Sequence, residues 1–416
     1  MKNILKKFCL FAVVCAMMLS LGTDVFADET LTGGKVGSSD GTALDGAITL
    51  EKELLVFNPS ETTIAAPQIT YTYTLTAGSA DKIITDSNEI SGYTLAGILP
   101  ATTTATVVYN NEDINAAAAG ESNIKTFSFD FSAVNYPRAG IYRYVVTETT
   151  NVEKSAAGVE DGTISNVRYL DVYVRDARDG ETGRQIYGYV LMTYDNSVDG
   201  RSEATVNTEA QAVKTTGFVA ATDSDGSTAL TPDIYKTWNL EIGKTLVNDS
   251  YMNSHEFPFT VDFANAGVTQ NVLLKVKTTG TASAVTTPAS EVLGTTTYAP
   301  KIANGGVVKY VGIPKASSVE VFETNDVHGT TYYSSYAVDG GTASEQLPIM
   351  ENDASDHVSL TEADETPVDH AIQYTNEFAL ISPTGLAWRI APYAIMLTLG
   401  IVLAIFAKKR QVNYFA

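Results

Sequence analysis

The segment ITYTYTL at residues 69–75 alternates apolar or aromatic side chains with threonines. This period of two is typical of a β-strand with one buried face. Similar segments recur between clusters of Gly, Asn, Asp and Ser, and we find no long amphipathic helical pattern. They are KTFSFDFS (125–132), YRYVVTE (142–148), YLDVYVRD (169–176), YGYVLMTY (187–194), FPFTVDF (257–263), NVLLKVK (271–277), GVVKYVGI (306–313) and VEVFETN (319–325). We therefore predict an all-β protein built from antiparallel, immunoglobulin-like β-sandwiches.

Both ends of the chain carry apolar segments. Residues 1–27 combine a basic start, an apolar stretch and a small-residue end, which predicts a secretory signal peptide. Residues 390–407 contain no charge, and as a helix they would span roughly 27 Å, enough for a bilayer core. We predict a transmembrane segment there and a basic cytoplasmic tail at 408–416. An ordinary C-terminal membrane anchor is one interpretation of this pattern.

Composition narrows the possible partners and the means of stabilisation. The chain has 48 acidic and 27 basic residues, a formal net charge of −21, so nucleic acid is not an expected partner. The two cysteines, Cys9 and Cys15, both lie in the predicted signal peptide. The exported part therefore has no disulfide, although secreted β-rich proteins often depend on disulfides.

The two halves of the exported part repeat one pattern. An early strand in each half carries a lysine, Lys52 in ITLEKELL and Lys244 in LEIGKTLV. A later strand in each half ends in a glutamate, Glu148 and Glu323, and the second half closes with AIQYTNEF, which contains Asn376. The repeat predicts two tandem domains. Their ranges are 42–225 and 233–379, with the polar segment 222–232 as the joint.

A lysine, a glutamate and an asparagine brought together in a core can react with one another. Burial disfavours both charges, so the amine and the acid tend to become neutral. The neutral amine is a nucleophile that can attack the asparagine carbonyl, while the glutamic acid polarises that carbonyl and moves protons. The product is a Lys–Asn amide, with loss of ammonia. The simpler alternative is that these common residue types occur at matching positions of the two halves by chance.

This pattern resembles the two-domain backbone pilins of Gram-positive bacteria, whose sandwiches carry intramolecular Lys–Asn isopeptide bonds assisted by a glutamate. The resemblance implies that Lys244 and Asn376 form such a bond, with Glu323 as the catalytic residue. In the first domain it assigns the same roles to Lys52 and Glu148.

The acceptor position of the first domain departs from the family pattern. The family's Phe-x-Asn falls on Phe218-Val219-Ala220, and an alanine side chain cannot accept the bond. Either the first domain lacks the crosslink, or a neighbour such as Asp223 or Asn239 serves as acceptor.

The same resemblance implies a sortase sorting signal at 381–385, Ile-Ser-Pro-Thr-Gly. Pro383 keeps the segment extended, and the bond between Thr384 and Gly385 is the one cleaved. The apolar segment 390–407 would hold the substrate at the membrane only transiently. Lys214 of the next copy is the expected nucleophile for Thr384. Its rivals are Lys154, Lys236 and Lys315.

No other chemistry is indicated. The four histidines show no metal-ligand spacing, so we expect no metal and no cofactor. We expect no enzymatic turnover, only a single self-crosslinking reaction. The predicted function is a pilus shaft subunit on the cell surface, anchored to the cell wall. Its implied partners are other copies of itself, a sortase, minor pilins and peptidoglycan. The alternative is a singly anchored adhesin that binds a host or neighbour-cell ligand.

Overall fold

A computed structural model of the chain describes residues 43–378 with internal gaps, together with residues 393 and 395–405. The gaps are 87–88, 111, 117–119, 194–196, 199–213, 223–228, 249–252, 266–271, 284–290, 294–295, 316, 325–331, 346 and 349–356. Four predictions lie outside the described residues: the signal peptide at 1–27, Asp223, the sorting signal at 381–385 and the tail at 408–416.

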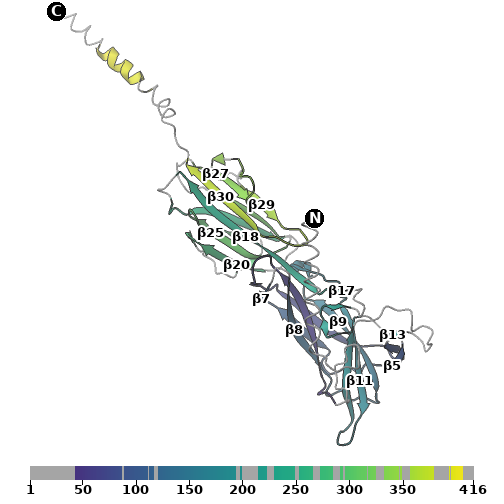
Figure 1. Cartoon of the computed structure of the whole chain (residues 1–416). Helices are drawn as coiled ribbons and strands as arrows, with labels where there is room; N and C mark the ends of the chain where they lie inside the picture. Colours follow the sequence, from purple (N-terminus) through teal and green to yellow (C-terminus); the bar gives the residue numbers. More distant parts are fainter. Residues whose placement is uncertain are drawn as a thin grey trace, which may run out of the picture.

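The all-β prediction is confirmed, and Figure 1 shows two β-rich lobes placed end to end. The first lobe contains a nine-stranded sheet. Its strands are β13 (Ser197–Val198), β4 (Ile83–Asp86), β5 (Glu89–Ala96), β9 (Gly140–Thr150), β11 (Val167–Asp176), β12 (Arg184–Met192) and β14 (Lys214–Thr215) in spatial order, with β3 (Ile69–Ala77) and β6 (Thr104–Tyr109) beside them. Facing this sheet are β1 (Ala47–Phe57), β8 (Glu121–Asp130) and β15 (Gly217–Phe218).

The second lobe pairs a larger sheet with a smaller one. The larger sheet contains, in order, β22 (Glu291–Leu293), β20 (Val272–Thr279), β25 (Val307–Pro314), β18 (Asp233–Val247), β30 (His370–Phe378), β27 (Tyr332–Val338) and β28 (Leu347–Pro348). The smaller sheet contains β21 (Ala282–Ser283), β24 (Lys301–Ile302), β19 (Phe257–Asn265), β26 (Ser317–Glu323) and β29 (Val358–Thr361), with β23 (Thr296–Tyr298) on β19.

A few short elements complete the described structure. They are the pairs β2 (Thr63–Ala65) with β7 (Asp113–Asn115) and β16 (Ala221–Thr222) with β17 (Ala229–Leu230), strand β10 (Val159–Glu160) and the 3-10 turn η1 (Ser155–Ala157). Residues 393 and 395–405 are helical. Among the described residues no helix is both long and apolar enough to span a membrane, so the predicted transmembrane segment at 390–407 is not confirmed.

Aromatic side chains pack the two sheets of each lobe together. In the first lobe Phe127 of β8 stacks on Tyr73 of β3, with ring centroids 3.7 Å apart. In the second lobe Phe259 of β19 meets the edge of Tyr374 of β30 at 5.1 Å. The alternation seen in the sequence supplies these contacts, because every second residue of a strand points to the same face. Both cores are therefore sandwiches of facing strands.

Strand β18 connects the two lobes. Its first residues pair in parallel with β1, from Leu54 opposite Asp233 to Phe57 opposite Lys236. Its later residues pair with β25 and, again in parallel, with β30. One uninterrupted strand thus belongs to a sheet of each lobe, and the joint between the lobes has a continuous backbone support.

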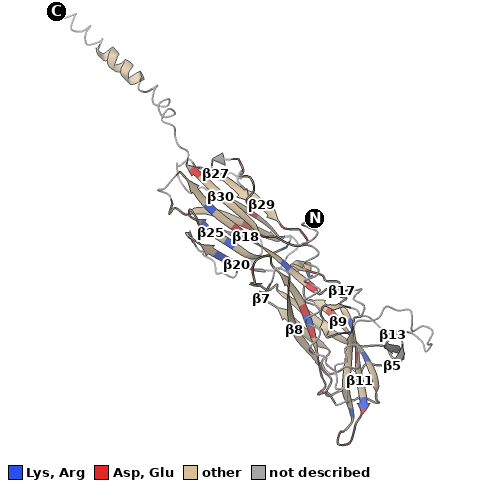
Figure 2. Cartoon of the chain, in the orientation of Figure 1, with Lys and Arg blue, Asp and Glu red and all other residues tan. Residues whose placement is uncertain are grey.

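Ion pairs also cross this joint. Glu61, in the segment after β1, accepts from Lys277 of β20 at 2.5 Å and from Lys309 of β25 at 3.0 Å. Figure 2 marks basic residues on these two strands of the second lobe. Burial raises the pKa of Glu61, but the two lysines outweigh it and hold that pKa below its ordinary value of 4.5. The folded protein therefore stabilises the ionised form of Glu61 relative to its protonated form.

The depressed pKa of Glu61 predicts an acid-sensitive joint. A carboxyl whose folded pKa is depressed adds stability above its ordinary pKa and loses it as pH falls through the folded value. We expect Glu61→Gln to cost about 0.5 to 1 kcal/mol of unfolding free energy at pH 7, as measured by denaturant melts, and progressively less below pH 4.5. Glu112→Gln is the matched control, because Glu112 is mostly exposed and lies 3.6 Å from Lys125. An equal effect of Glu61→Gln at neutral and acid pH would contradict the prediction.

Candidate intramolecular crosslink sites

Three strands of the second lobe bring Lys244, Glu323 and Asn376 together in the core. Lys244 lies on β18, Glu323 ends β26 and Asn376 lies on β30. The parallel register places Lys244 opposite Tyr374 and Leu246 opposite Asn376. All three polar side chains are buried, with exposed fractions of 1%, 3% and 0%. The strand pairing therefore places the lysine beside the asparagine, and the facing sheet supplies the glutamate.

Glu323 bridges the other two side chains. Its Oε2 lies 2.6 Å from Lys244 Nζ, and its Oε1 accepts from Asn376 Nδ2 at 2.7 Å. Ser334 Oγ donates weakly to the same Oε2 at 3.4 Å. Asn376 Oδ1 is buried and has no hydrogen-bond partner among the described residues. Within the described part of the chain, the amide carbonyl is thus a buried polar group of this site that no hydrogen bond occupies.

The surroundings of Lys244 are apolar. Its Nζ lies 4.5 Å from the ring centroid of Phe257 and 5.6 Å from that of Phe259. Lys244 is buried, and the carboxylate of Glu323 is in contact with its amine. A proton passed from the amine to this carboxylate would leave a neutral amine and a neutral acid, and no charge would then be buried at the site. A neutral amine beside an amide carbonyl is the arrangement that condensation requires.

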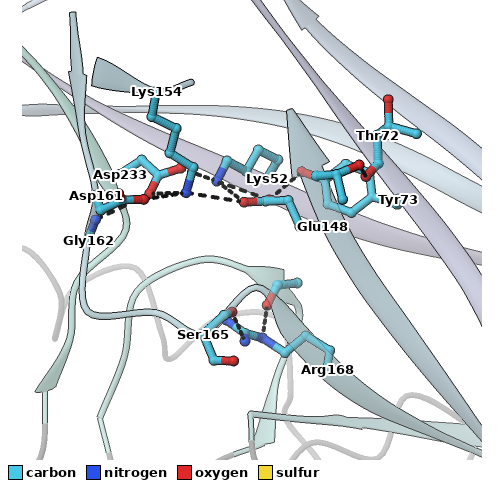
Figure 3. A network of polar contacts seen from close by, with 12 residues as sticks. Lys52, Thr72, Tyr73, Glu148, Lys154, Asp161, Gly162, Ser165, Arg168 and Asp233 are labelled. Carbon is cyan, nitrogen blue, oxygen red and sulfur yellow. Dashed lines mark hydrogen bonds and ion pairs between the residues drawn. The ribbon is translucent and has the colours of Figure 1, made fainter. Parts of the chain in front are cut away.

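The first lobe has a related site, drawn in Figure 3. Lys52 of β1 lies 3.1 Å from Glu148 Oε2 of β9, and Tyr73 donates to that same oxygen at 2.9 Å. Lys52 Nζ also lies 4.1 Å from the ring centroid of Tyr71. The third partner is Asp233, whose Oδ2 is 2.8 Å from Lys52 Nζ. Lys52 and Glu148 are thus brought together, and a carboxyl stands where the second lobe has an amide.

Asp233 was not among the predicted site residues. Strand β15 pairs with β1 only as far as Phe218, which lies opposite Lys52. The chain then leaves the sheet, and Asp233 at the start of β18 takes the place opposite Leu54. The sequence repeat assigns residue 233 to the start of the second domain. For that reason it was not considered as a site residue of the first domain. The available signal was the length of β18, whose fifteen residues exceed what one sandwich needs.

Of the two alternative acceptors considered from the sequence, Asn239 does not occupy this position. Asp223 lies outside the described residues. Asn239 exchanges amide hydrogen bonds with Asn58, at 3.0 and 2.8 Å, and donates to Asp369 at 2.8 Å. The described contacts of Asn239 thus belong to a buried network at the joint.

Asp233 is held by a second cation and a backbone amide. Its Oδ1 accepts from Lys154 Nζ at 2.9 Å and from the Gly162 N–H at 3.2 Å. Burial raises the pKa of Asp233, but Lys52 and Lys154 outweigh it and leave that pKa below its ordinary value. Burial lowers the pKa of Lys154, yet Asp233 and Asp161 leave it above its ordinary value. Lys154 therefore remains charged beside Oδ1.

The predicted inter-subunit residues are only partly described. Lys214 lies on β14 opposite Met192 and is half-buried, whereas Pro383, Thr384 and Gly385 lie outside the described residues. The rival lysines are engaged in ion pairs. Lys154 contacts Asp161 and Asp233, while Lys236 and Lys315 both contact Glu160. Among the described residues no group of three metal-ligating side chains lies close enough to hold an ion.

Comparison with known proteins finds pilins among the proteins that are similar to this chain. A curated pilin of Streptococcus pyogenes serotype M1 is 26% identical over 367 residues, which cover 87% of this chain and 89% of the relative. The resemblance to Gram-positive pilins is confirmed. Two solved pilin structures from Streptococcus pyogenes also match. The major pilin has a TM-score of 0.41 and 17% identity over 80% of this chain and 99% of that one. The major pilin T3.2 has a TM-score of 0.40 and 18% identity over 80% and 100%. No protein-family model matches the chain.

Proposed function

We propose that this chain is a shaft subunit of a covalently assembled pilus on the surface of a Gram-positive cell. The observation that carries the proposal is the buried Lys244–Glu323–Asn376 arrangement, in a chain that is similar to a pilin over most of its length. Its two domains are residues 42–225 and 233–379. The exported chain passes to a sortase through the signal at 381–385 and is anchored in the cell wall.

The single chemical event inside the second lobe is formation of an amide. Lys244 Nζ, after transferring its proton to Glu323, attacks Asn376 Cγ. The Cγ–Nδ2 bond then breaks, Glu323 gives its proton to the leaving nitrogen and takes up the second proton that Nζ loses, and ammonia departs. Because Glu323 already contacts both the amine and the amide nitrogen, it is placed to take the proton from one and return it to the other. The bond joins β18 to β30.

Peptide mapping of the purified protein tests this step. Trypsin should release a branched peptide that joins residues 237–275 to residues 316–389, or to 316–384 after sortase cleavage, with a mass one ammonia below the sum of its parts. We expect Glu323→Gln to abolish the branched peptide, because glutamine cannot accept the proton of Lys244.

Glu320→Gln is the matched control for that experiment. Glu320 lies on the same strand, but its side chain is partly exposed and contacts His357 instead of the core site. The branched peptide should persist in this variant. Two separate linear peptides in the unmodified protein would refute the intramolecular bond.

A further inference from the structure

We propose that the first lobe also crosslinks itself, through an amide between Lys52 Nζ and Asp233 Cγ, with Glu148 as the proton carrier and water as the leaving group. This inference rests on the proposed condensation chemistry of the second lobe. It replaces the asparagine acceptor by an aspartic acid, and it places that acceptor on the strand that begins the next lobe. The bond would therefore join β1 to β18.

Strand register makes the two sites equivalent. In the second lobe the acceptor Asn376 lies opposite Leu246, two residues beyond Lys244 on a parallel neighbour. In the first lobe Asp233 lies opposite Leu54, again two residues beyond the lysine on a parallel neighbour. Parallel strands with the same offset present their side chains to the core in the same relation. Asp233 is thus the structural counterpart of Asn376, although it belongs to a different part of the sequence repeat.

The distances within the first site suit the reaction. Lys52 Nζ lies 2.8 Å from Asp233 Oδ2 and 3.1 Å from Glu148 Oε2. The exposed fractions of Lys52, Glu148 and Asp233 are 2%, 4% and 3%. The amine, the carbonyl carbon and the proton carrier are therefore held in contact and away from water, as in the second lobe.

A carboxyl acceptor needs more assistance than an amide does, and the site supplies it. Attack on Asp233 Cγ places negative charge on Oδ1, the oxygen that does not leave. Lys154 and the Gly162 N–H already donate to that oxygen, at 2.9 and 3.2 Å. Preorganised donors of this kind stabilise an oxyanion as it forms. The second lobe has no such donor described at Asn376 Oδ1, so this pair is a specific feature of the aspartate site.

The step balances without any further reactant. Glu148 accepts a proton from the Lys52 ammonium, and the neutral amine attacks Cγ. The Nζ–Cγ bond forms and the Cγ–Oδ2 bond breaks. Oδ2 leaves as water after receiving the proton from Glu148 and the second proton lost by the nitrogen. Nothing is oxidised or reduced.

Two bonds anchored on one strand would create a continuous covalent path. Tension entering at the C-terminal end of β30 would pass from Asn376 to Lys244, along β18 to Asp233, and from there to Lys52 on β1. The lobes could then not be pulled apart at the joint.

Peptide mapping distinguishes this bond from that of the second lobe. Modification of Lys52 blocks trypsin there, so the expected product joins residues 36–82 to residues 215–236 with the loss of one water. Asp233→Ala should abolish this product and leave the branched peptide of the second lobe intact. Asp233→Asn should restore it with the loss of ammonia instead of water. Because the two branched peptides are separate, absence of the first alone overturns this inference, and absence of the second overturns the proposed function.

Lys154 is the competing amine, and its variants decide which nitrogen reacts. We expect Lys154→Arg to retain the bond to Lys52, because arginine keeps the positive charge at Oδ1 but is not a nucleophile. We expect Lys154→Met to reduce the crosslinked fraction, because Oδ1 loses a donor. A branched peptide that joins residues 144–168 to residues 215–236 would show that Lys154 is the donor and overturn the assignment of Lys52. Equal amounts of crosslink in the Met and Arg variants would overturn the role of Lys154.

Discussion

Lys244→Met is expected to lower the unfolding free energy of the second lobe by about 5 kcal/mol or more. The proposed bond closes a loop from residue 244 to residue 376, longer than the 100-residue loop for which chain entropy gives about 4.7 kcal/mol. At about 2 to 4 °C per kcal/mol for a lobe of this size, the melting temperature should fall by about 10 to 20 °C. Methionine is chosen because it is unbranched and apolar, so it fits among Phe257 and Phe259 without leaving a buried unpaired cation.

The control for this prediction is Ser334→Ala. Ser334 donates to the same Glu323 oxygen at 3.4 Å, so its loss disturbs the polar site without removing the amine or the acceptor. We expect a change of about 1 kcal/mol or less. Differential scanning calorimetry of the two variants and the parent chain measures both effects. If Lys244→Met melts within a few degrees of the parent, the lobe is not held by this bond.

Lys214→Arg is expected to remove the ladder of covalent multimers from cell-wall extracts on denaturing gels. A sortase acyl-intermediate at Thr384 needs a neutral amine to resolve it, and a guanidinium stays charged. The other lysines considered, Lys154, Lys236 and Lys315, each form an ion pair with a carboxylate. Thr384→Ala should remove the ladder as well, because the acyl group can no longer form.

Lys301→Arg is the matched control for the polymer. Lys301 lies on β24, is exposed, and forms no ion pair with any residue that the structure describes. Its replacement should leave the ladder unchanged. A ladder that survives Lys214→Arg would assign the linkage to another lysine. A single band from the unmodified chain would instead indicate a singly anchored surface protein, the alternative function.

The sequence predicted the fold class because strand formation depends on local alternation. The segments at 69–75, 142–148 and 257–263 all lie within strands, β3, β9 and β19. Alternating aromatic and β-branched residues leave one face apolar, and the face must be buried wherever the strand lies. The repeat likewise located Lys244, Glu323 and Asn376, because each falls on a strand of that kind at a position that points to the core.

The partner of Lys52 could not be predicted from the sequence alone. Asn376 is recognisable because it lies in the last strand of its own repeat, whereas Asp233 belongs by sequence to the following repeat. Only the pairing of β1 first with β15 and then with β18 brings it to the lysine. Pairing between strands almost two hundred residues apart depends on the packing of whole sheets, and no local pattern encodes it.

By itself, the sequence determined that this chain forms sandwiches and that a lysine and a glutamate face the core in each half. Side-chain alternation sets the face of a residue, and that is a local property. Only the tertiary structure shows which carboxyl or amide group contacts each lysine. It also shows that the aspartate of the first site, Asp233, lies on β18, a strand that continues into the second lobe. Contact between distant strands is set by sheet register, which the core as a whole selects.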